Sequence, residues 1–333
     1  MAEDEGIALK NKKTTVLFIA GSGRSGSTLL NKILGQVDDF FSVGELRYIW
    51  ERSLTEDRLC GCGVRFSQCS LWQAILERAF GREGVDTAKL LATQQQCTRV
   101  RHVPSVLFGA HGRSGIEWVE YRQQLTRLYA AISGVTGCRV VVDSSKISTF
   151  GYMLDTIESI DLYIVHLIRD PRAAAYSWLR SKPQPDGGPL DSMQQQSAVK
   201  SSVLWDIWNV TVVALWRHRS GRYLRLRYED FVARPHEAVE QILAMVGHAG
   251  ADTPFVNDET VVIGPNHSVA GNPNRLETGN VTLSADTEWL TRMRRWDRAV
   301  ATGVTLPLLR CFGYQIWPGQ NPWLPLALAR RNR

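Results

Sequence analysis

The sequence has no apolar run long enough for a membrane-spanning helix. No stretch of the 333 residues reaches the roughly 18 uninterrupted apolar residues that such a helix requires. The most apolar candidate, Leu204–Trp216, carries Asp206 and Asn209, which indicates a buried or amphipathic helix. The first residues are acidic and polar, so they also lack the basic start and apolar core of a secretory signal. We therefore expect a cytoplasmic protein without a transmembrane segment.

The sequence also has few cysteines and only a small excess of positive charge. Six cysteines in a chain of this length do not make the disulfide framework of a small secreted domain. Lysine and arginine number 39 against 33 aspartates and glutamates, a formal net charge of +6. This mild excess suits a site for anionic small molecules and falls short of the dense basic patch typical of a nucleic-acid surface. We expect no nucleic-acid partner.

Short apolar runs alternate with helical patterns along most of the chain. The strand-like runs are Thr15–Ala20, Arg139–Asp143, Leu162–Ile168 and Tyr223–Arg227. The helical patterns are Ser27–Gln36, Leu71–Phe80, Glu117–Ser133, Ala173–Arg180, Met193–Arg219, Glu237–Val246, Trp289–Ala301 and Leu306–Cys311. Near-continuous apolar strands separated by helices are typical of a parallel sheet that is covered on both faces. The sequence predicts an α/β fold with a central, mostly parallel β-sheet flanked by helices in a three-layer sandwich.

A glycine-rich turn joins the first predicted strand to the first predicted helix, and it reads GSGRSGST over residues 21–28. Glycines let successive backbone N–H groups converge on one anion, and the N-terminus of the helix adds its positive end. The residues expected to contact that anion are Gly23, Arg24, Ser25, Gly26, Ser27 and Thr28. The turn therefore predicts a phosphate-binding loop, although similar turns also occur without ligands.

The turn departs from the nucleotide-triphosphatase pattern G-x-x-x-x-G-K-[ST]. Gly21, Gly26 and Thr28 fit that pattern. Ser27, however, stands where the lysine is required, and the cation of the loop is Arg24. Because that lysine reaches the β- and γ-phosphates, its absence argues against hydrolysis of ATP or GTP. A P-loop small-molecule or nucleotide kinase, or a non-catalytic nucleotide-binding protein, remains an alternative.

The turn resembles that of the sulfotransferases that use 3′-phosphoadenosine 5′-phosphosulfate (PAPS), in the arginine form typical of the tyrosylprotein, carbohydrate and bacterial branches. A second motif matches independently, because a predicted strand ends in Arg169, Pro171 opens a helix, and Ser177 lies eight residues past Arg169. A strand-end arginine and a helix serine can converge on one phosphate. In the family, this second motif binds the 3′-phosphate and the turn holds the 5′-phosphosulfate. The resemblance implies PAPS as donor and 3′-phosphoadenosine 5′-phosphate (PAP) as product.

Two further segments carry looser matches to the family. The family's Tyr-Glu-Asp motif contacts the adenine through its tyrosine, which implies this role for Tyr228, with simple packing as the alternative. The loop from His267 to Arg275 is similar to a bacterial form with Gly-Asn-Pro and an arginine. By that resemblance, Arg275 is a third phosphate ligand and Asn272 contributes less. The Arg-Lys-Gly and Gly-Asp-Trp motifs of cytosolic relatives do not occur here in that form.

The expected reaction needs an in-line acceptor oxygen, positive charge around the transferred group, and a base for the acceptor's proton. In tyrosylprotein and some carbohydrate and bacterial sulfotransferases, a glutamate at the place of Glu45 is that base. Cytosolic members use a downstream histidine, and the corresponding stretch here, Val142–Lys146, contains none. An ion pair with Arg47 or a helix cap is the other interpretation of Glu45.

Lys146 follows a predicted strand and is expected to join Arg24 in neutralising the bridging oxygen that leaves, with Ser144 and Ser145 as alternative donors. The catalytic set is thus Glu45, Arg24 and Lys146. The chemistry requires no metal, because the transferred group carries less charge than a phosphoryl group and Arg and Lys suffice.

Cys60, Cys62 and Cys69 lie in one predicted loop. Three sulfurs could begin a zinc site, but structural zinc needs four ligands and no adjacent histidine completes the set. We expect a reduced structural loop, with a disulfide as the next alternative and zinc as the last.

The resemblance implies one sulfotransferase domain over residues 1–333, with a core at 14–316. By elimination, residues 60–115 form an acceptor-side insertion, 182–197 a lid loop rich in Pro and Gly, and 317–333 a basic C-terminal tail. The expected activity is transfer of the sulfuryl group from PAPS to a hydroxyl of a small-molecule, lipid or carbohydrate acceptor.

Overall fold

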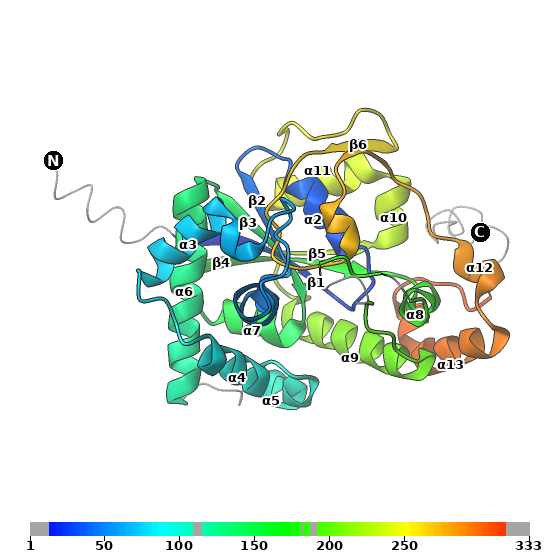
Figure 1. Cartoon of the computed structure of the whole chain (residues 1–333). Coiled ribbons are helices and arrows are strands. Elements are labelled where there is room, and N and C mark those ends of the chain that lie inside the picture. The colour runs from blue at the N-terminus through cyan, green and yellow to red at the C-terminus, as the bar shows by residue number, and fades with distance from the viewer. Residues whose placement is uncertain (1–12, 109–114, 182, 187–191, 318–333) are drawn as a thin grey trace.

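A five-stranded parallel sheet forms the centre of the computed structural model, which describes residues 13–108, 115–181, 183–186 and 192–317 (Figure 1). The strands are β1 (Thr14–Ala20), β2 (Phe40–Gly44), β3 (Val140–Lys146), β4 (Ile160–Ile168) and β5 (Tyr223–Arg227), in the order β2-β3-β1-β4-β5. The four predicted strands and the fold class are confirmed. The sequence analysis missed β2, because its five-residue run is short and follows the first helix after a brief turn.

Both faces of the sheet are buried, as the continuous apolar strands require. In β1, Val16 and Phe18 pack into one core, and Leu17 and Ile19 pack into the other. Figure 1 shows the helices in two layers, with α2 (Ser27–Leu34), α10 (Tyr228–Ala233) and α11 (Pro235–Met245) above the sheet and α7 (Ser148–Asp155) and α9 (Ala198–Trp216) below it. The predicted three-layer arrangement is therefore present.

The other described elements complete these layers. They are η2 (Leu46–Tyr48), η3 (Ile49–Thr55), η4 (Phe66–Gln68), α3 (Ser70–Phe80), α4 (Thr87–Cys97), η5 (Val100–His102), α5 (Val103–Leu107), α6 (Ile116–Thr136), α8 (Pro171–Leu179), β6 (Thr260–Ile263), η6 (Pro273–Leu276), β7 (Gly279–Thr282), α12 (Glu288–Arg292) and α13 (Arg295–Cys311). β6 and β7 pair in an antiparallel hairpin, which the sequence analysis also missed.

Two helix predictions are corrected. The pattern predicted from Met193 begins only at Ala198, because the side chain of Ser197 accepts a hydrogen bond from the Lys200 N–H and caps the helix there. The last two predicted helices are a short α12 and a long α13 that continues through Pro307. Packing of α13 against α8 and α9 holds the helix across this proline, which would end an isolated helix.

Among the described residues, α9 is the one helix long and apolar enough to cross a membrane, judged by length and composition. It packs against β4, α8 and α13, where Trp205 is buried, and against α7, where Trp216 is buried. A core helix of a globular domain has the same composition and the same contacts.

Candidate active site at the phosphate-binding loop

Three predicted site residues meet at the carboxyl ends of β1, β3 and β4. The N–H of Gly21, which follows β1, donates to the carbonyl of Lys146 at the end of β3 over 3.1 Å. The guanidinium of Arg169, which follows β4, donates through Nη1 to the carbonyl of Arg24 over 3.0 Å. Parallel strands place their carboxyl ends on one edge, where ligands of such sheets bind. The structure thus brings together Arg24, Lys146 and Arg169, which are far apart in the sequence.

The loop between β1 and α2 has the backbone of an anion cradle. Gly26 caps α2 with a left-handed φ of 90°, and Arg24 also has a positive φ, of 66°. A Cβ atom on Gly23 would collide with the ring of Trp178, and one on Gly26 would collide with the ring of Tyr228. Both positions therefore require glycine, and the two rings cover the loop from α8 and α10.

Several buried donors of this loop have no partner among the residues that the structure describes. Arg24 Nε and Nη2 and the Ser25 hydroxyl are buried without a hydrogen bond. The remaining Arg24 Nη1 lies 3.2 Å from the sulfur of Met193, a weak acceptor, and the guanidinium stacks over Trp178 with its centre 4.6 Å from the ring. Unpaired buried donors are costly unless a ligand satisfies them. Their chemistry fits a bound anion.

The charges around Arg24 also fit a bound anion. Burial lowers the pKa of Arg24, Glu45 opposes this shift, and the positive charges of Arg169 and Arg180 add to it. Three guanidinium groups therefore share one region, where Glu45 acts on Arg24 and Asp286 pairs with Arg169 and Arg180. An anionic ligand would relieve the repulsion between these cations.

Glu45 and Lys146 form a buried ion pair beside the loop. The Lys146 ammonium lies 2.5 Å from Glu45 Oε1 and also donates to the carbonyl of Ser144 at 3.3 Å. Burial alone would raise the pKa of Glu45, but the charge and hydrogen bond of Lys146, with the charges of Arg52 and Arg47, together hold this pKa below its ordinary value. The partner of Glu45 is thus Lys146, not the Arg47 that the sequence offered. Glu45 is ionised at neutral pH.

The end of β3 is held in place by its own polar residues. β3 runs to Lys146, three residues further than predicted, and Lys146 has a positive φ of 67°. Ser145 accepts a hydrogen bond from the Arg47 N–H over 3.1 Å, and its own N–H donates to Asp143 over 2.7 Å. Ser145 therefore fixes the backbone between Glu45 and Lys146 and is occupied in that role.

Arg169 is almost fully buried among partners that belong to other elements. Its Nη2 lies 2.6 Å from a carboxylate oxygen of Asp286, and its guanidinium centre lies 4.9 Å from the ring of Tyr228. Ser177 lies buried on α8, two turns after the strand end. Tyr228 therefore packs against both Arg169 and Gly26, and it lies between the two predicted anion sites.

Asp286 competes for the cation that is predicted to bind the 3′-phosphate. We expect Asp286→Asn to bind PAP about threefold to fivefold more tightly, because the variant removes a carboxylate from Arg169 and keeps the oxygen that accepts from the Glu288 N–H. Isothermal titration calorimetry measures the change. Asp258→Asn, an exposed position, is the matched control and should bind as the wild type does. Unchanged or weaker binding by Asp286→Asn would show that Asp286 does not compete.

Arg275, the predicted third phosphate ligand, is buried among acceptors of the protein itself. Its side chain is 1% exposed and donates to the carbonyls of Ser268 and Leu59 and to the carboxylate of Asp186, at 3.1, 2.6 and 2.7 Å. The sequence placed an arginine in this loop but could not show that the side chain turns into the protein. Arg275 joins three segments through these contacts, and its role as a phosphate ligand stays a prediction.

Asn272 contacts the loop through its backbone. Its N–H lies 3.4 Å from the hydroxyl of Thr28, and its side chain caps η6. The ammonium of Lys32 on α2 donates to the carbonyls of Asn274 and Glu277, at 2.7 and 2.8 Å. The segment from 272 to 277 is thus fixed to the helix that follows the phosphate loop, and Asn272 supports that loop from outside.

Sequence reasoning missed four residues around the site: Trp178, Arg180, Met193 and Asp286. Trp178 directly follows Ser177 on α8 and Arg180 is the residue after this helix ends, so their proximity to the site could have been inferred from the predicted helix. Met193 belongs to the predicted lid at 182–197, of which residue 182 and residues 187–191 lie outside the described residues. The described part reaches Arg24 through Met193. Most of the predicted tail at 317–333 and residues 109–114 of the predicted insertion are likewise not described.

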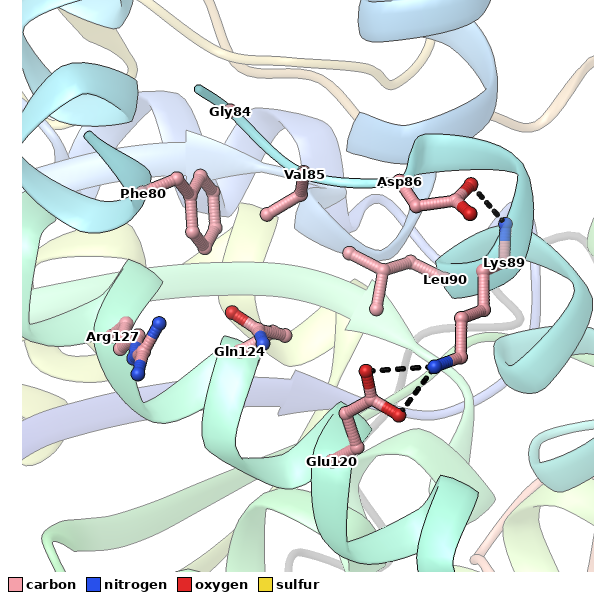
Figure 2. A pocket seen from close by; sticks show the side chains of 9 residues that line it. All are labelled: Phe80, Gly84, Val85, Asp86, Lys89, Leu90, Glu120, Gln124 and Arg127. Carbon is pink, nitrogen blue, oxygen red and sulfur yellow. Dashed lines mark hydrogen bonds and ion pairs between the residues drawn. The ribbon is translucent and has the colours of Figure 1, made fainter. Parts of the chain in front are cut away.

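A separate cavity of about 230 Å³ lies between α6 and the part of the predicted insertion that carries α3 and α4. Figure 2 shows Lys89 reaching across its mouth to the carboxylate of Glu120, with Phe80, Val85 and Leu90 on the walls. None of the predicted site residues lines this cavity. It is therefore not part of the site at the phosphate loop.

The comparisons with known proteins agree with this geometry. Residues 17–252 match the family model described as the sulfotransferase family. The chain belongs to the sulfotransferase family. Its fold is similar to that of the sulfotransferase domain from the Synechococcus PCC 7002 olefin synthase, at 20% identity over 92% of this chain and 96% of that one, with a TM-score of 0.53.

A second solved structure, the sulfotransferase domain from the curacin biosynthetic pathway, matches at 18% identity over 89% of this chain and 98% of that one, with a TM-score of 0.48. No curated protein matches the sequence. The family match confirms the resemblance drawn from the motifs. The first structural likeness confirms that this sulfotransferase has the P-loop sulfotransferase fold. They support sulfotransferase activity in general.

Proposed function

We propose that this sulfotransferase uses PAPS as its donor and transfers the sulfuryl group to a hydroxyl of a small-molecule, lipid or carbohydrate acceptor. The observation that carries the proposal is a set of buried donors that have no partner in the described part of the chain: Arg24 Nε and Nη2 and the Ser25 hydroxyl. Arg169 lies directly beside them. PAPS, when bound, supplies a sulfuryl group on a good leaving phosphate and a second charged group at its 3′ position. A donor with two anionic ends matches two neighbouring cationic sites.

The binding roles follow from the elements that carry the side chains. The backbone N–H groups from Gly23 to Thr28, the side chains of Arg24 and Ser25, and the start of α2 would hold the 5′-phosphosulfate. Arg169 and Ser177 would hold the 3′-phosphate, with the guanidinium providing a two-pronged contact. Tyr228 lies between the two sites with its ring on Arg169 and Gly26, which supports a contact with the adenosine.

Glu45 is the proposed general base. It is ionised, buried and held beside Arg24, so it can accept the proton of an acceptor hydroxyl without a prior deprotonation step. Lys146 and Arg24 neutralise the charge that develops on the leaving oxygen. When Lys146 turns toward that oxygen, Glu45 loses its closest cation and its pKa rises, which makes it a stronger base at the moment a base is needed.

The acceptor would enter from the side of the predicted insertion and lid. Met193 of the lid touches Arg24, and Asp186 of the same segment pairs with Arg275. Gln94 of the insertion donates to the carbonyl of Arg47, two residues after Glu45. Both segments therefore contact the immediate surroundings of the proposed catalytic residues, which supports their role in shaping the acceptor pocket and excluding water.

A phosphotransferase is the weaker proposal. Ser27 replaces the lysine that such enzymes use. Lys32, one turn later on the same helix, does not replace it, because its ammonium is buried against the carbonyls of Asn274 and Glu277. α2 therefore offers no lysine that could contact a γ-phosphate during its transfer.

A thermal-shift comparison tests the donor. PAP without magnesium, at about 100 times its Kd, should stabilise the protein by about 2.7 kcal/mol, which corresponds to a rise in Tm of about 5 °C. AMP, which lacks the 3′-phosphate, is the matched control and should give a clearly smaller shift. A response to Mg-ATP alone would favour the phosphotransferase, and no response to PAP would contradict PAPS as the donor.

A further inference from the structure

Three cysteines and one histidine gather at one point outside the proposed active site. Cys60, Cys62, Cys69 and His267 each offer one ligand atom, and these four atoms all lie within 4.8 Å of one another. The sequence analysis ranked zinc last because no adjacent histidine completes the set. The fold, however, brings His267 to the cysteine loop from about two hundred residues away.

Three of the six distances between the ligand atoms are close to those of a tetrahedral metal site. Cys62 Sγ and Cys69 Sγ are 3.9 Å apart, and His267 Nδ1 lies 3.7 Å from Cys60 Sγ and 3.3 Å from Cys69 Sγ. A tetrahedral zinc with Zn–S bonds of about 2.3 Å and a Zn–N bond of about 2.0 Å gives an S···S separation of about 3.8 Å and an S···N separation of about 3.5 Å. The three thiols are free, so none is engaged in a disulfide.

We propose that Cys60, Cys62, Cys69 and His267 bind one zinc ion in a closed structural site. Three thiolates and one imidazole are a complete tetrahedral ligand set, and soft sulfur donors select zinc over magnesium or calcium. Cys60 and Cys69 are nearly fully buried, and all four positions are filled by protein atoms. The ion would therefore stabilise the fold and leave no position for water or substrate.

The backbone holds these ligands in place independently of any ion. A tight turn brings Cys60 and Cys62 together, since the N–H of Gly63 donates to the Cys60 carbonyl over 2.9 Å and the Cys60 N–H donates to Val64 over 2.8 Å. Cys69 caps α3, whose Trp72 donates its indole N–H to the His267 carbonyl over 2.7 Å. The ligands thus come from rigid elements, as an ordered metal site requires.

The proposed zinc would join the insertion to the loop that supports Glu45. Next to His267, the Ser268 carbonyl accepts from Gly61 over 3.0 Å. Two residues further, the Ala270 carbonyl accepts from the Glu45 N–H, also over 3.0 Å. His267 is therefore three residues before Ala270, whose carbonyl contacts the backbone of the proposed base. Zinc at this point would position the insertion and Glu45 relative to each other without taking part in the reaction.

Metal analysis of the purified full-length protein tests the proposal. We expect about one zinc per chain by mass spectrometry of the metal content, and at least a tenfold loss in Cys62→Ser and His267→Ala. His267→Cys supplies a fourth sulfur and should retain zinc. Cys311→Ser, on the exposed surface of α13, is the matched control and should also retain it. Loss of zinc in both His267→Ala and Cys311→Ser would contradict the assignment.

Cobalt provides a readout that does not depend on folding of a variant or on activity. Wild-type protein exchanged into Co²⁺ should show thiolate-to-cobalt charge-transfer bands and the intense visible bands of tetrahedral cobalt, and zinc should abolish them. A protein that is isolated without zinc and binds neither Co²⁺ nor Zn²⁺, or that carries a Cys62–Cys69 disulfide in thiol titration, would overturn the proposal. PAP binding, measured separately, reports on the donor site, so a failure here is distinguishable from a failure of the proposed function.

Discussion

Glu45→Gln is expected to lower kcat by about 10²- to 10⁴-fold while PAP binds as tightly as to the wild type or slightly more tightly. The amide keeps the size and one oxygen of Glu45 but cannot accept the proton of the acceptor hydroxyl. Removing the negative charge from beside Lys146 and Arg24 does not weaken an anion site. Turnover with a labelled sulfuryl donor and calorimetry with PAP measure the two quantities separately.

Controls separate catalysis by Glu45 from structural support. Glu77→Gln, an exposed position on α3, should turn over at the wild-type rate. In the wild type, kcat/KM should fall as the pH drops through the lowered pKa of Glu45, so the acid limb lies below the ordinary range of a glutamate. That limb should be missing in Glu45→Gln. A Gln variant within about threefold of the wild-type rate would remove Glu45 from the role of base.

Arg169→Ala is expected to weaken PAP binding by about 10- to 100-fold and to change AMP binding much less. A charge-assisted hydrogen bond to a phosphate contributes about 1.5–3 kcal/mol, and only PAP has the 3′-phosphate that Arg169 would contact. Calorimetry with both nucleotides yields the ratio of affinities, which should fall toward one. Arg169→Lys keeps the charge but loses the planar fork, so it should give an intermediate ratio.

Arg169 also supports the phosphate loop, and the experiment has to distinguish that role. Its Nη1 donates to the Arg24 carbonyl, and its removal leaves Asp286 without its closest cation. The double variant Arg169→Ala with Asp286→Asn removes the unpaired carboxylate. Arg234→Ala, an exposed position between α10 and α11, is the matched control for a lost arginine. Equal loss of PAP and AMP affinity in the double variant would mean that Arg169 supports the phosphate loop and does not bind the 3′-phosphate.

The parts of the fold that the sequence predicted are those encoded by local patterns. β1 and β4 are runs of apolar residues buried on both faces, and their order with the intervening helices predicts a parallel sheet. The phosphate loop is equally local, because its glycines and the first turn of α2 are consecutive in the chain. Arg169 could be placed at the site because it directly follows β4, and Arg24 because it lies in the glycine-rich loop after β1.

Side chains that depend on contacts between distant loops could not be predicted in this way. Arg275 sits in a loop that looked like a ligand segment, yet its guanidinium binds Leu59 and Asp186, which the sequence does not connect to it. Asp286 reaches Arg169 from a segment without a recognisable pattern. A loop's residue types predict what its side chains can bind, but the packing of other segments decides the direction in which they point.

The sequence by itself determined the α/β fold class, the phosphate loop and the cationic residues at its edge, because apolar periodicity and glycine spacing act over a few neighbouring residues. Only the tertiary structure decided which residues pair: Glu45 with Lys146, Arg169 with Asp286, and His267 with the cysteines of the insertion. Each pair joins segments whose separation along the chain carries no periodic signal. These paired residues come together because the sheet and the loops that cover it are buried against one another.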